Sequence, residues 1–359
     1  MRNYYPGITI FKLSGSLLVL FAHLFLIRYM AQMPAQSLVQ FVSLATRIVV
    51  PCFYVVAGFL AYKGWSRAAS PKGYVVKYAA RIGIVYAFFC LLFIAESIVP
   101  KLISDGLTAG NLFLQAKVLF MTFFLNGPFI QFWFIPPLVF GVTAAYLLLR
   151  RQRDRLAMYL TLAFFAAVQF VSGSFQTAGG EAFGAFAFLQ PDHAEYLVAF
   201  ATRYFGFGFT FVVAGALLAK YEERFLSVKI KPLLLASIAL TVLETAALFR
   251  YTEWTTDYKL TIGALPNTVL LFYGILRIRS RAAGAYHRQI SLFSAVTFFT
   301  HILLMKLNLY MLGWSVDSMH VWQDLVYLML TLLECIAITV LIGLSSKRLP
   351  ARQAGNLPS

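Results

Sequence analysis

The sequence predicts an all-α polytopic membrane protein with about ten transmembrane helices and both termini in the cytoplasm. Three observations carry this prediction. The composition is 60% hydrophobic and 12% charged, with a mean hydropathy of +0.75, whereas soluble domains are about 25% charged. The apolar residues gather in segments near the ~20 residues that cross the hydrocarbon of a bilayer. The basic residues gather in alternate loops, as they do in multi-pass membrane proteins.

Ten apolar segments can be counted, and together they make one transmembrane domain over residues 1–346, followed by a short cytoplasmic tail at 347–359. In chain order the predicted spans are 7–29, 44–62, 77–99, 131–149, 156–173, 198–219, 232–250, 260–276, 290–311 and 321–344. Two outer connections are long. The apolar stretch from Asn111 to Leu125 either lies in the membrane interface or re-enters the membrane. The Gly-rich segment 174–197 is either a lid or a plain loop.

The charge of the loops orients the chain. Of the 30 basic residues, 20 fall on one side of the predicted spans, and by the positive-inside rule this side is cytoplasmic. We therefore expect a multi-pass protein of the plasma or inner membrane, with the lipid bilayer as its surroundings. The net charge of +16 then reports topology, and no nucleic-acid partner is expected. The three cysteines lie inside apolar runs, which indicates packing and neither a disulfide framework nor a metal site.

The first span, GITIFKLSGSLLVLFAHLFLIR, carries two residues that a membrane helix should avoid, Lys12 and His23. Their separation of 11 residues places both side chains on one stripe of a helix, roughly 16 Å apart along its axis. An ionisable residue inside a membrane indicates a functional site. His23 can take a proton from a hydroxyl and return it to a leaving group. Lys12 either snorkels to the headgroups or binds a phosphate or carboxylate from the cytoplasm.

Other polar residues fall inside the predicted spans. Arg81 either snorkels or binds phosphate with its planar guanidinium. His301, in TFFTHILLMKL, adds a second intramembrane histidine and so favours a polar path. The acidic residues Glu96, Glu244 and Glu334 either pair with basic groups or carry protons. The remaining members are Arg47, Gln169, Arg203, Lys306 and Asn308. The sequence contains no HExxH, P-loop, GxGxxG or GxSxG motif, so chemistry typical of soluble enzymes is not indicated.

Several segments together resemble the integral-membrane acyltransferase family 3. In that family's first helix a basic residue, usually arginine, precedes an essential histidine by eleven positions, as Lys12 precedes His23. RIVVPCFYVVAGFLAY resembles the second helix, with Ala57 at a position that is serine in the family. The other matching segments are YVVKYAARIGIVY with Arg81, QFWFIPPLVF with Trp133, FTHILLMKL with His301, and RYFGFGFTFVVAGALLAKYEERF. Lys12 keeps the charge of the family's arginine without its bidentate geometry.

The resemblance implies transfer of an acyl group, typically acetyl, from cytoplasmic acyl-CoA to a hydroxyl of a cell-surface glycan or a lipid-linked sugar. It implies that His23 is the catalytic residue, acting directly on the hydroxyl or carrying the acyl group briefly. Lys12, Arg81, His301 and Trp133 are then expected to bind the donor or substrate. No metal and no bound cofactor are expected, since acyl-CoA is a substrate. The main alternative is a proton-coupled transporter or a polysaccharide-export protein, and a sensor or scaffold is a third.

Overall fold

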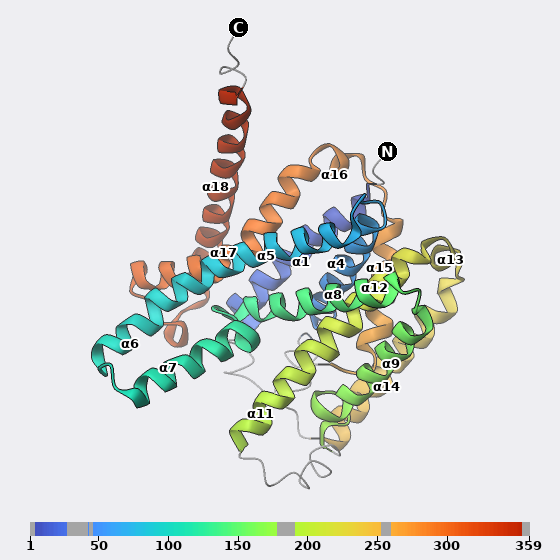
Figure 1. Cartoon of the computed structure of the whole chain (residues 1–359), viewed down its shortest axis with the longest axis horizontal. Helices are drawn as coiled ribbons and strands as arrows, with labels where there is room; N and C mark the ends of the chain where they lie inside the picture. The colour runs from blue at the N-terminus through green and yellow to red at the C-terminus, as the bar shows by residue number, and fades with distance from the viewer. Residues whose placement is uncertain (1–3, 27–41, 43–45, 178–190, 253–259, 354–359) are drawn as a thin grey trace. The chain divides into compact units, whose positions relative to one another are not determined.

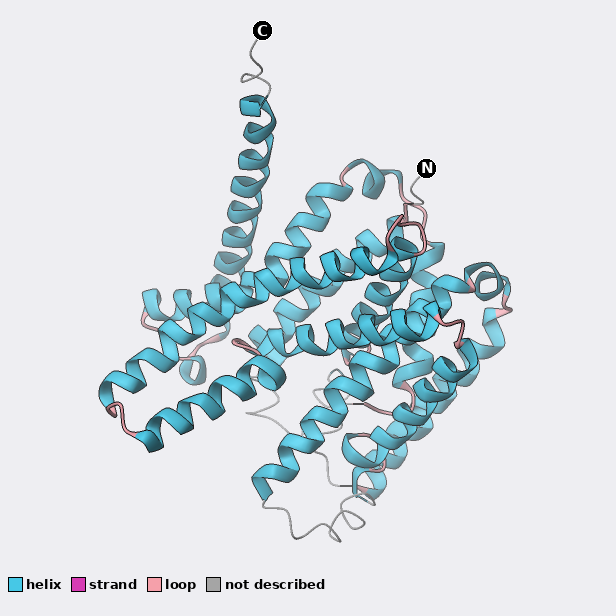
Figure 2. Cartoon of the chain, viewed as in Figure 1, coloured by secondary structure: helices cyan, strands magenta, loops and turns pink. Residues whose placement is uncertain are grey.

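The structure, a computed structural model, describes residues 4–26, 42, 46–177, 191–252 and 260–353. Its described part is built from helices (Figures 1 and 2). Within the described ranges the β-structure is limited to one isolated bridge, between Gly173 and Leu260. The all-α prediction is therefore confirmed for these residues. The middle of the predicted outer loop 174–197 lies outside the described residues.

Among the described residues, eight helices are long and apolar enough to cross a membrane: Pro6–Phe25, Pro71–Ser104, Ile130–Arg150, Asp154–Ser172, Ala194–Lys220, Ile230–Tyr251, His287–Leu312 and Val321–Ser345. Two further predicted spans, 44–62 and 260–276, correspond to shorter helices. These are α4 (Val49–Trp65) with 17 residues and α15 (Ala264–Arg277) with 14. A multi-pass membrane protein is thus supported, while the count of ten spans and the cytoplasmic termini stay predictions.

One compact unit joins the two ends of the chain, residues 1–43 and 274–359. Its described elements are α1 (Pro6–Phe21), η1 (Ala22–Leu26), α16 (Arg281–Ala285), α17 (His287–Leu312), η7 (Val316–Ser318) and α18 (Val321–Gln353). α1 packs on α16 and α17, and α17 packs on α18. The buried side chains of Leu20, Leu24, Met319 and Tyr327 form a shared apolar core. Helices from opposite ends of the sequence therefore hold one another in place.

The second unit contains residues 44–273. Besides α4 and the first part of α15, its helical elements are α5 (Pro71–Phe93), η2 (Ile94–Ile98), α6 (Val99–Ser104), α7 (Ala109–Met121), η3 (Thr122–Asn126), η4 (Ile130–Phe134), α8 (Ile135–Arg150), α9 (Asp154–Ser172), α11 (Pro191–Phe200), η6 (Ala201–Phe209), α12 (Thr210–Lys220), α13 (Glu222–Ser227) and α14 (Ile230–Tyr251). Its most extensive helix pair is α4 against α12. Small residues allow this close approach, as is typical of helix pairs in membranes.

Substitution of Gly58 by Leu is expected to destabilise this second unit. A Cβ atom at Gly58 would lie 2.0 Å from the carbonyl oxygen of Val212 on α12, so α4 and α12 would have to separate. Overpacking of this kind lowers the free energy of unfolding by about 3 kcal/mol. The control is Gly83→Leu on α5, where a Cβ would meet nothing within 4 Å. Thermal unfolding in detergent should show a lower Tm for the first variant only, and equal Tm values would contradict the packing described.

The polypeptide returns from the α6–α7 hairpin into a break between η3 and α8 (Figure 1). Gly127 makes this break, with φ +75° and ψ 156°, a conformation that favours glycine. A Cβ at Gly127 would also lie 2.5 Å from the backbone nitrogen of Trp133. The chain then forms the short 3₁₀ turn η4 before α8 begins. The chain between η3 and α8 is therefore irregular around Gly127.

Three tyrosines from different helices satisfy carbonyl groups around the break. Each hydroxyl donates to a backbone oxygen: Tyr86 to Phe123 at 2.8 Å, Tyr204 to Phe124 at 2.7 Å and Tyr54 to Phe134 at 3.1 Å. Tyr54 is fully buried. Irregular backbone at membrane depth is tolerated where the protein itself provides hydrogen-bond partners. The break is therefore a stable part of the fold.

The length of the neighbouring apolar helix indicates that the break lies at hydrocarbon depth. The helix Pro71–Ser104 has 34 residues and is about 51 Å long at 1.5 Å per residue. The hydrocarbon of a bilayer is about 30 Å thick. Wherever this helix crosses it completely, the middle of the helix therefore lies inside the hydrocarbon. Tyr86, about 22 Å from the Pro71 end, falls in that middle. The hydrogen bond from Tyr86 therefore favours the re-entrant alternative for Asn111–Leu125.

Ion pairs join the helices of the second unit at the end that we expect to be cytoplasmic. Lys63 pairs with Glu222 at 2.7 Å, and Lys220 pairs with Asp154 at 2.6 Å. The phenol of Tyr221 donates to the same Asp154 carboxylate, and this hydrogen bond raises the pKa of Tyr221 above its ordinary value. Each partner comes from a different helix or turn, so these contacts fix the ends of α4, α9 and α12.

Candidate active site

Two histidines meet inside the first unit, one from each end of the chain. His23 lies in the π-helical turn η1, and His301 lies in α17. The Nε2 atom of His301 is 3.2 Å from Nδ1 of His23, and the ring centroids are 5.1 Å apart. The same Nδ1 of His23 is 2.8 Å from the carbonyl oxygen of Val19. Nδ1 of His301 is 2.7 Å from the carbonyl oxygen of Thr297 and 3.1 Å from that of Phe298.

These partners assign the protons of both rings. Carbonyl oxygens only accept hydrogen bonds, so Nδ1 of each histidine carries hydrogen, and in a neutral imidazole the other nitrogen then carries a lone pair. The Nε2 lone pair of His301 therefore accepts from the Nδ1–H of His23, which is shared with Val19. The Nε2 atom of His23 keeps its lone pair and has no hydrogen-bond partner among the described residues. That nitrogen is suited to act as a base or a nucleophile.

The surroundings of the pair restrict access to one side. His301 is fully buried, with 0% of its surface exposed, and His23 is half-buried. Leu20, three residues before His23, and Leu24, directly after it, belong to the apolar core of the unit. The π turn itself is a helix irregularity that often occurs at functional sites. The first unit thus presents one imidazole nitrogen and encloses the other histidine.

Lys12 lies in α1, the helix that leads directly into the π-helical turn with His23. The α-helix is continuous from Pro6 to Phe21, so Lys12 keeps the predicted axial separation of roughly 16 Å from His23. Its side chain is half-buried, and the described residues form no ion pair or hydrogen bond with it. The ammonium group is therefore available to a ligand.

Arg81 and Trp133 belong to the second unit. Arg81 is exposed on α5, as expected for either alternative predicted for it. Trp133 lies in η4, directly after the helix break, and is half-buried. The guanidinium of Arg203 lies 5.7 Å from its ring centroid, and the ring of Phe207 lies 5.3 Å from it. The contact between Trp133 and Arg203 was not predicted, because the two residues are distant in the sequence.

Two of the three intramembrane glutamates have polar, uncharged partners. Asn308, which is 1% exposed, donates to Glu334 at 2.8 Å between α17 and α18. Glu244 accepts from the backbone N–H groups of Ile262 and Gly263 at 2.6 and 2.8 Å, ahead of the first turn of α15. The carboxylates therefore join helices. In the described part of the chain, no group of three or more His, Cys, Asp and Glu residues could hold a metal ion.

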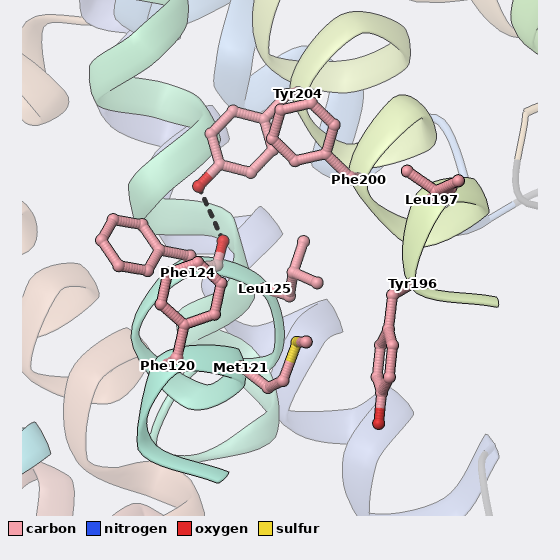
Figure 3. A pocket seen from close by; sticks show the side chains of 8 residues that line it. All are labelled: Phe120, Met121, Phe124, Leu125, Tyr196, Leu197, Phe200 and Tyr204. Atoms are coloured by element: carbon pink, nitrogen blue, oxygen red, sulfur yellow. Dashed lines mark hydrogen bonds between the residues drawn. The ribbon is translucent and has the colours of Figure 1, made fainter. Parts of the chain in front are cut away.

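An apolar groove of about 480 Å³ lies between η3 and the α11–η6 helix (Figure 3). It is closed at one end by the hydrogen bond from Tyr204 to the carbonyl of Phe124. Its lining is aromatic and aliphatic: Phe120, Met121, Phe124, Leu125, Tyr196, Leu197, Phe200 and Tyr204. The exposed Phe120 and Leu197 side chains make this groove suited to hydrocarbon chains and unsuited to polar chemistry.

The fold and the histidine pair together describe a helical protein of the multi-pass membrane type, with two imidazole rings in contact. The chain belongs to the acyltransferase family 3, because the model of its acyltransferase domain matches residues 5–342. The matched domain is an acyltransferase domain, and the long apolar helices indicate a multi-pass membrane protein. An amino-acid racemase from Enterococcus faecalis is 27% identical over 171 residues, which are 46% of this chain and 22% of that protein. The chain thus matches less than a quarter of the length of this curated relative. No solved structure matches the chain.

Proposed function

We propose that the protein transfers an acyl group, most simply acetyl, from cytoplasmic acyl-CoA to a hydroxyl of a glycan or lipid-linked sugar, with His23 as the catalytic residue. The observation that carries the proposal is the free Nε2 lone pair of His23, next to a histidine that accepts its Nδ1–H. Such an acceptor fixes the orientation and tautomer of a catalytic imidazole, as the third member of a catalytic triad does.

In this mechanism Nε2 of His23 removes the proton from the acceptor hydroxyl as its oxygen attacks the thioester carbonyl. The tetrahedral intermediate then collapses, the carbon–sulfur bond breaks, and the sulfur of CoA receives the proton from Nε2. His301 accepts the Nδ1–H of His23 throughout and stabilises the transient imidazolium. In a second route Nε2 attacks the thioester carbonyl first, the carbon–sulfur bond breaks and CoA leaves as its thiolate. The acceptor hydroxyl then attacks the acyl group on His23, the bond to Nε2 breaks, and the hydroxyl proton passes to the CoA thiolate.

The donor fits the layout of α1. A CoA thioester carries its phosphates far from the acyl carbon, at the end of the thin pantetheine arm. Lys12 lies on the same helix as His23, with roughly 16 Å between them along the axis, and its ammonium has no partner among the described residues. We assign Lys12 to the donor phosphates at the cytoplasmic end, with Arg81 as a further donor contact and Trp133 as a contact to the acceptor substrate. The protein would then lie in the plasma or inner membrane with both termini in the cytoplasm.

The direct test uses purified protein in liposomes with acetyl-CoA that is radiolabelled in the acetyl group. Label should pass to an added glycan acceptor, while a transporter would accumulate solute inside the vesicles and label no glycan. Failure to label any hydroxyl acceptor, with intact protein and a panel of sugars, would contradict the proposal.

Lys12→Gln is expected to raise the KM for acetyl-CoA about tenfold or more with little change in kcat, because one charge-assisted contact to phosphate is lost. Lys12→Arg should retain the low KM, since it keeps the charge. Lys101→Gln, at a lysine in α6, is the matched control. Initial rates at varied acetyl-CoA concentration give both constants. An unchanged KM would contradict donor binding by Lys12 and favour the alternative in which its side chain extends to the lipid headgroups.

A further inference from the structure

A cation lies beside the helix break of the second unit. Arg203 comes from the π-helical segment η6, and its Nη1 donates to the side-chain oxygen of Asn126 at 2.9 Å. Its guanidinium lies 5.7 Å from the ring centroid of Trp133. Asn126 ends η3 and Trp133 lies in η4, so the two residues flank the break. Three elements thus bring a guanidinium, an amide and an indole together.

The hydrogen-bonding capacity of Arg203 is largely unused. A guanidinium has five N–H donors, and among the described residues Arg203 makes one hydrogen bond, to Asn126. No carboxylate in the described part of the chain pairs with Arg203. The side chain is half-buried and lies beside a break that is at hydrocarbon depth, where an unpaired cation is costly. A ligand that accepts hydrogen bonds would offset this cost.

The geometry of the group selects the ligand. The planar fork of a guanidinium matches two oxygens of a phosphate or carboxylate, and this bidentate contact is stronger than a neutral hydrogen bond. Asn126 uses its oxygen for Arg203, which leaves its exposed NH₂ group as a further donor. Trp133 adds a half-exposed ring, and aromatic side chains of this kind bury a large apolar area. The site is therefore suited to an oxyanion attached to a small organic group.

The depth of the site separates two sources of an oxyanion. Phosphates of the surrounding lipids lie in the headgroup region, outside the ~30 Å of hydrocarbon, whereas the break lies within it. The phosphates of CoA are already assigned to the cytoplasmic end. We propose that Arg203, Asn126 and Trp133 bind an oxyanion, phosphate or carboxylate, that is carried by the sugar acceptor. This inference rests on the proposed function, because it specifies the chemistry of that acceptor.

The test measures binding without the acyl donor. Purified protein in lipid nanodiscs is titrated with a hexose phosphate, a hexuronate and the neutral hexose, and binding is followed by tryptophan fluorescence. Wild type should bind one or both acidic sugars, and at the same concentrations the neutral hexose should give no signal. Arg203→Gln should weaken acidic-sugar binding at least tenfold. Trp133→Phe should remove the fluorescence change, while an independent binding measurement still detects the ligand.

Two further variants keep the result interpretable. Arg203→Lys keeps the charge and the fold but loses the planar fork, so its affinity should be intermediate between wild type and Arg203→Gln. Arg224→Gln is the matched control, since this arginine also lies over an aromatic ring, that of Tyr221 at 6.0 Å, outside the site. Its affinity should equal that of wild type.

Absence of acidic-sugar binding to wild type, or equal affinities of wild type and both Arg203 variants, would overturn the inference. Binding with the expected Arg203 dependence, together with no acyl transfer to any acceptor, would overturn the proposed function and leave this anion site established. Acyl transfer that proceeds equally well to neutral and acidic sugars, and that is unchanged in Arg203→Gln, would overturn the anion site alone.

Discussion

Replacement of His23 by Asn is expected to lower kcat for acyl transfer at least a hundredfold, since a positioned general base contributes about 10²- to 10⁴-fold to the rate. The Asn side chain can place its NH₂ group where Nδ1–H now lies and still donate to Val19, which His23 contacts at 2.8 Å. What it removes is the Nε2 lone pair. The loss should therefore appear in turnover, with the folded yield and the KM for acetyl-CoA preserved.

The matched control is His287→Asn. His287 is an exposed histidine at the start of α17, and its Nδ1 contacts the carbonyl oxygen of Gly284 at 3.1 Å, so both histidines hydrogen-bond to a backbone carbonyl a few residues earlier. Single-turnover transfer of labelled acetyl groups should be normal in His287→Asn and nearly absent in His23→Asn. Equal rates in the two variants would remove His23 from the reaction.

The same pair of variants separates the two chemical routes. Wild type incubated with labelled acetyl-CoA and no acceptor would retain label on the protein if His23 carries the acyl group, and His23→Asn would not. If His23 acts as a base only, neither protein retains label, although the wild type still transfers acetyl when acceptor is added. Rapid denaturing quench and counting of the protein fraction decide between these outcomes.

Replacement of His301 is expected to have the second-largest effect. His301→Leu removes the acceptor of the Nδ1–H of His23 while leaving Val19 as its remaining partner. The imidazole of His23 is then held less firmly in one orientation, and its cation is less stabilised. We therefore expect kcat to fall about tenfold to hundredfold, as for loss of a hydrogen bond to a charged group. The KM for acetyl-CoA should stay the same, because we assign the donor phosphates to Lys12 and not to His301.

His301→Gln provides the rescue. A glutamine side-chain oxygen can accept from His23 as the Nε2 atom of His301 does, so this variant should recover part of the lost kcat. Steady-state kinetics of the two variants, with Tm measured alongside, distinguish positioning from packing. If the Leu and Gln variants lost activity equally and in proportion to their loss of Tm, His301 would have a structural role only.

The sequence was informative about the helices and about one half of the active site. Apolar length and loop charge identify the long helices because each depends only on local composition. The helix that carries Lys12 could be predicted and is α1, but His23 lies in the π-helical turn η1 that follows it, so the shared face of the two side chains stays a prediction. The family resemblance added Arg81, His301 and Trp133. The roles of these residues stay predictions, since the structure holds no ligand.

The contacts that give the site its chemistry could not be predicted. His301 lies 278 positions after His23, and no periodicity relates two helices so far apart. The shared hydrogen bond, the proton assignment that follows from it, and the approach of Arg203 to Trp133 all depend on tertiary packing. The helix break at Gly127 is different, because an Asn-Gly-Pro run is a visible turn signal. The Asn-Gly-Pro run alone, however, does not distinguish the two alternatives for Asn111–Leu125, a segment in the membrane interface or one that re-enters the membrane.

The two histidines of the pair come from helices far apart in the sequence, and this separation has a consequence for how the protein is synthesised. A ribosome adds about 5–20 residues per second, so the 278 residues between the two histidines take about 14 to 56 s to synthesise. During that interval the first helix carries an imidazole whose later acceptor does not yet exist. A growing chain can therefore form the His23–His301 hydrogen bond only after α17 has been synthesised.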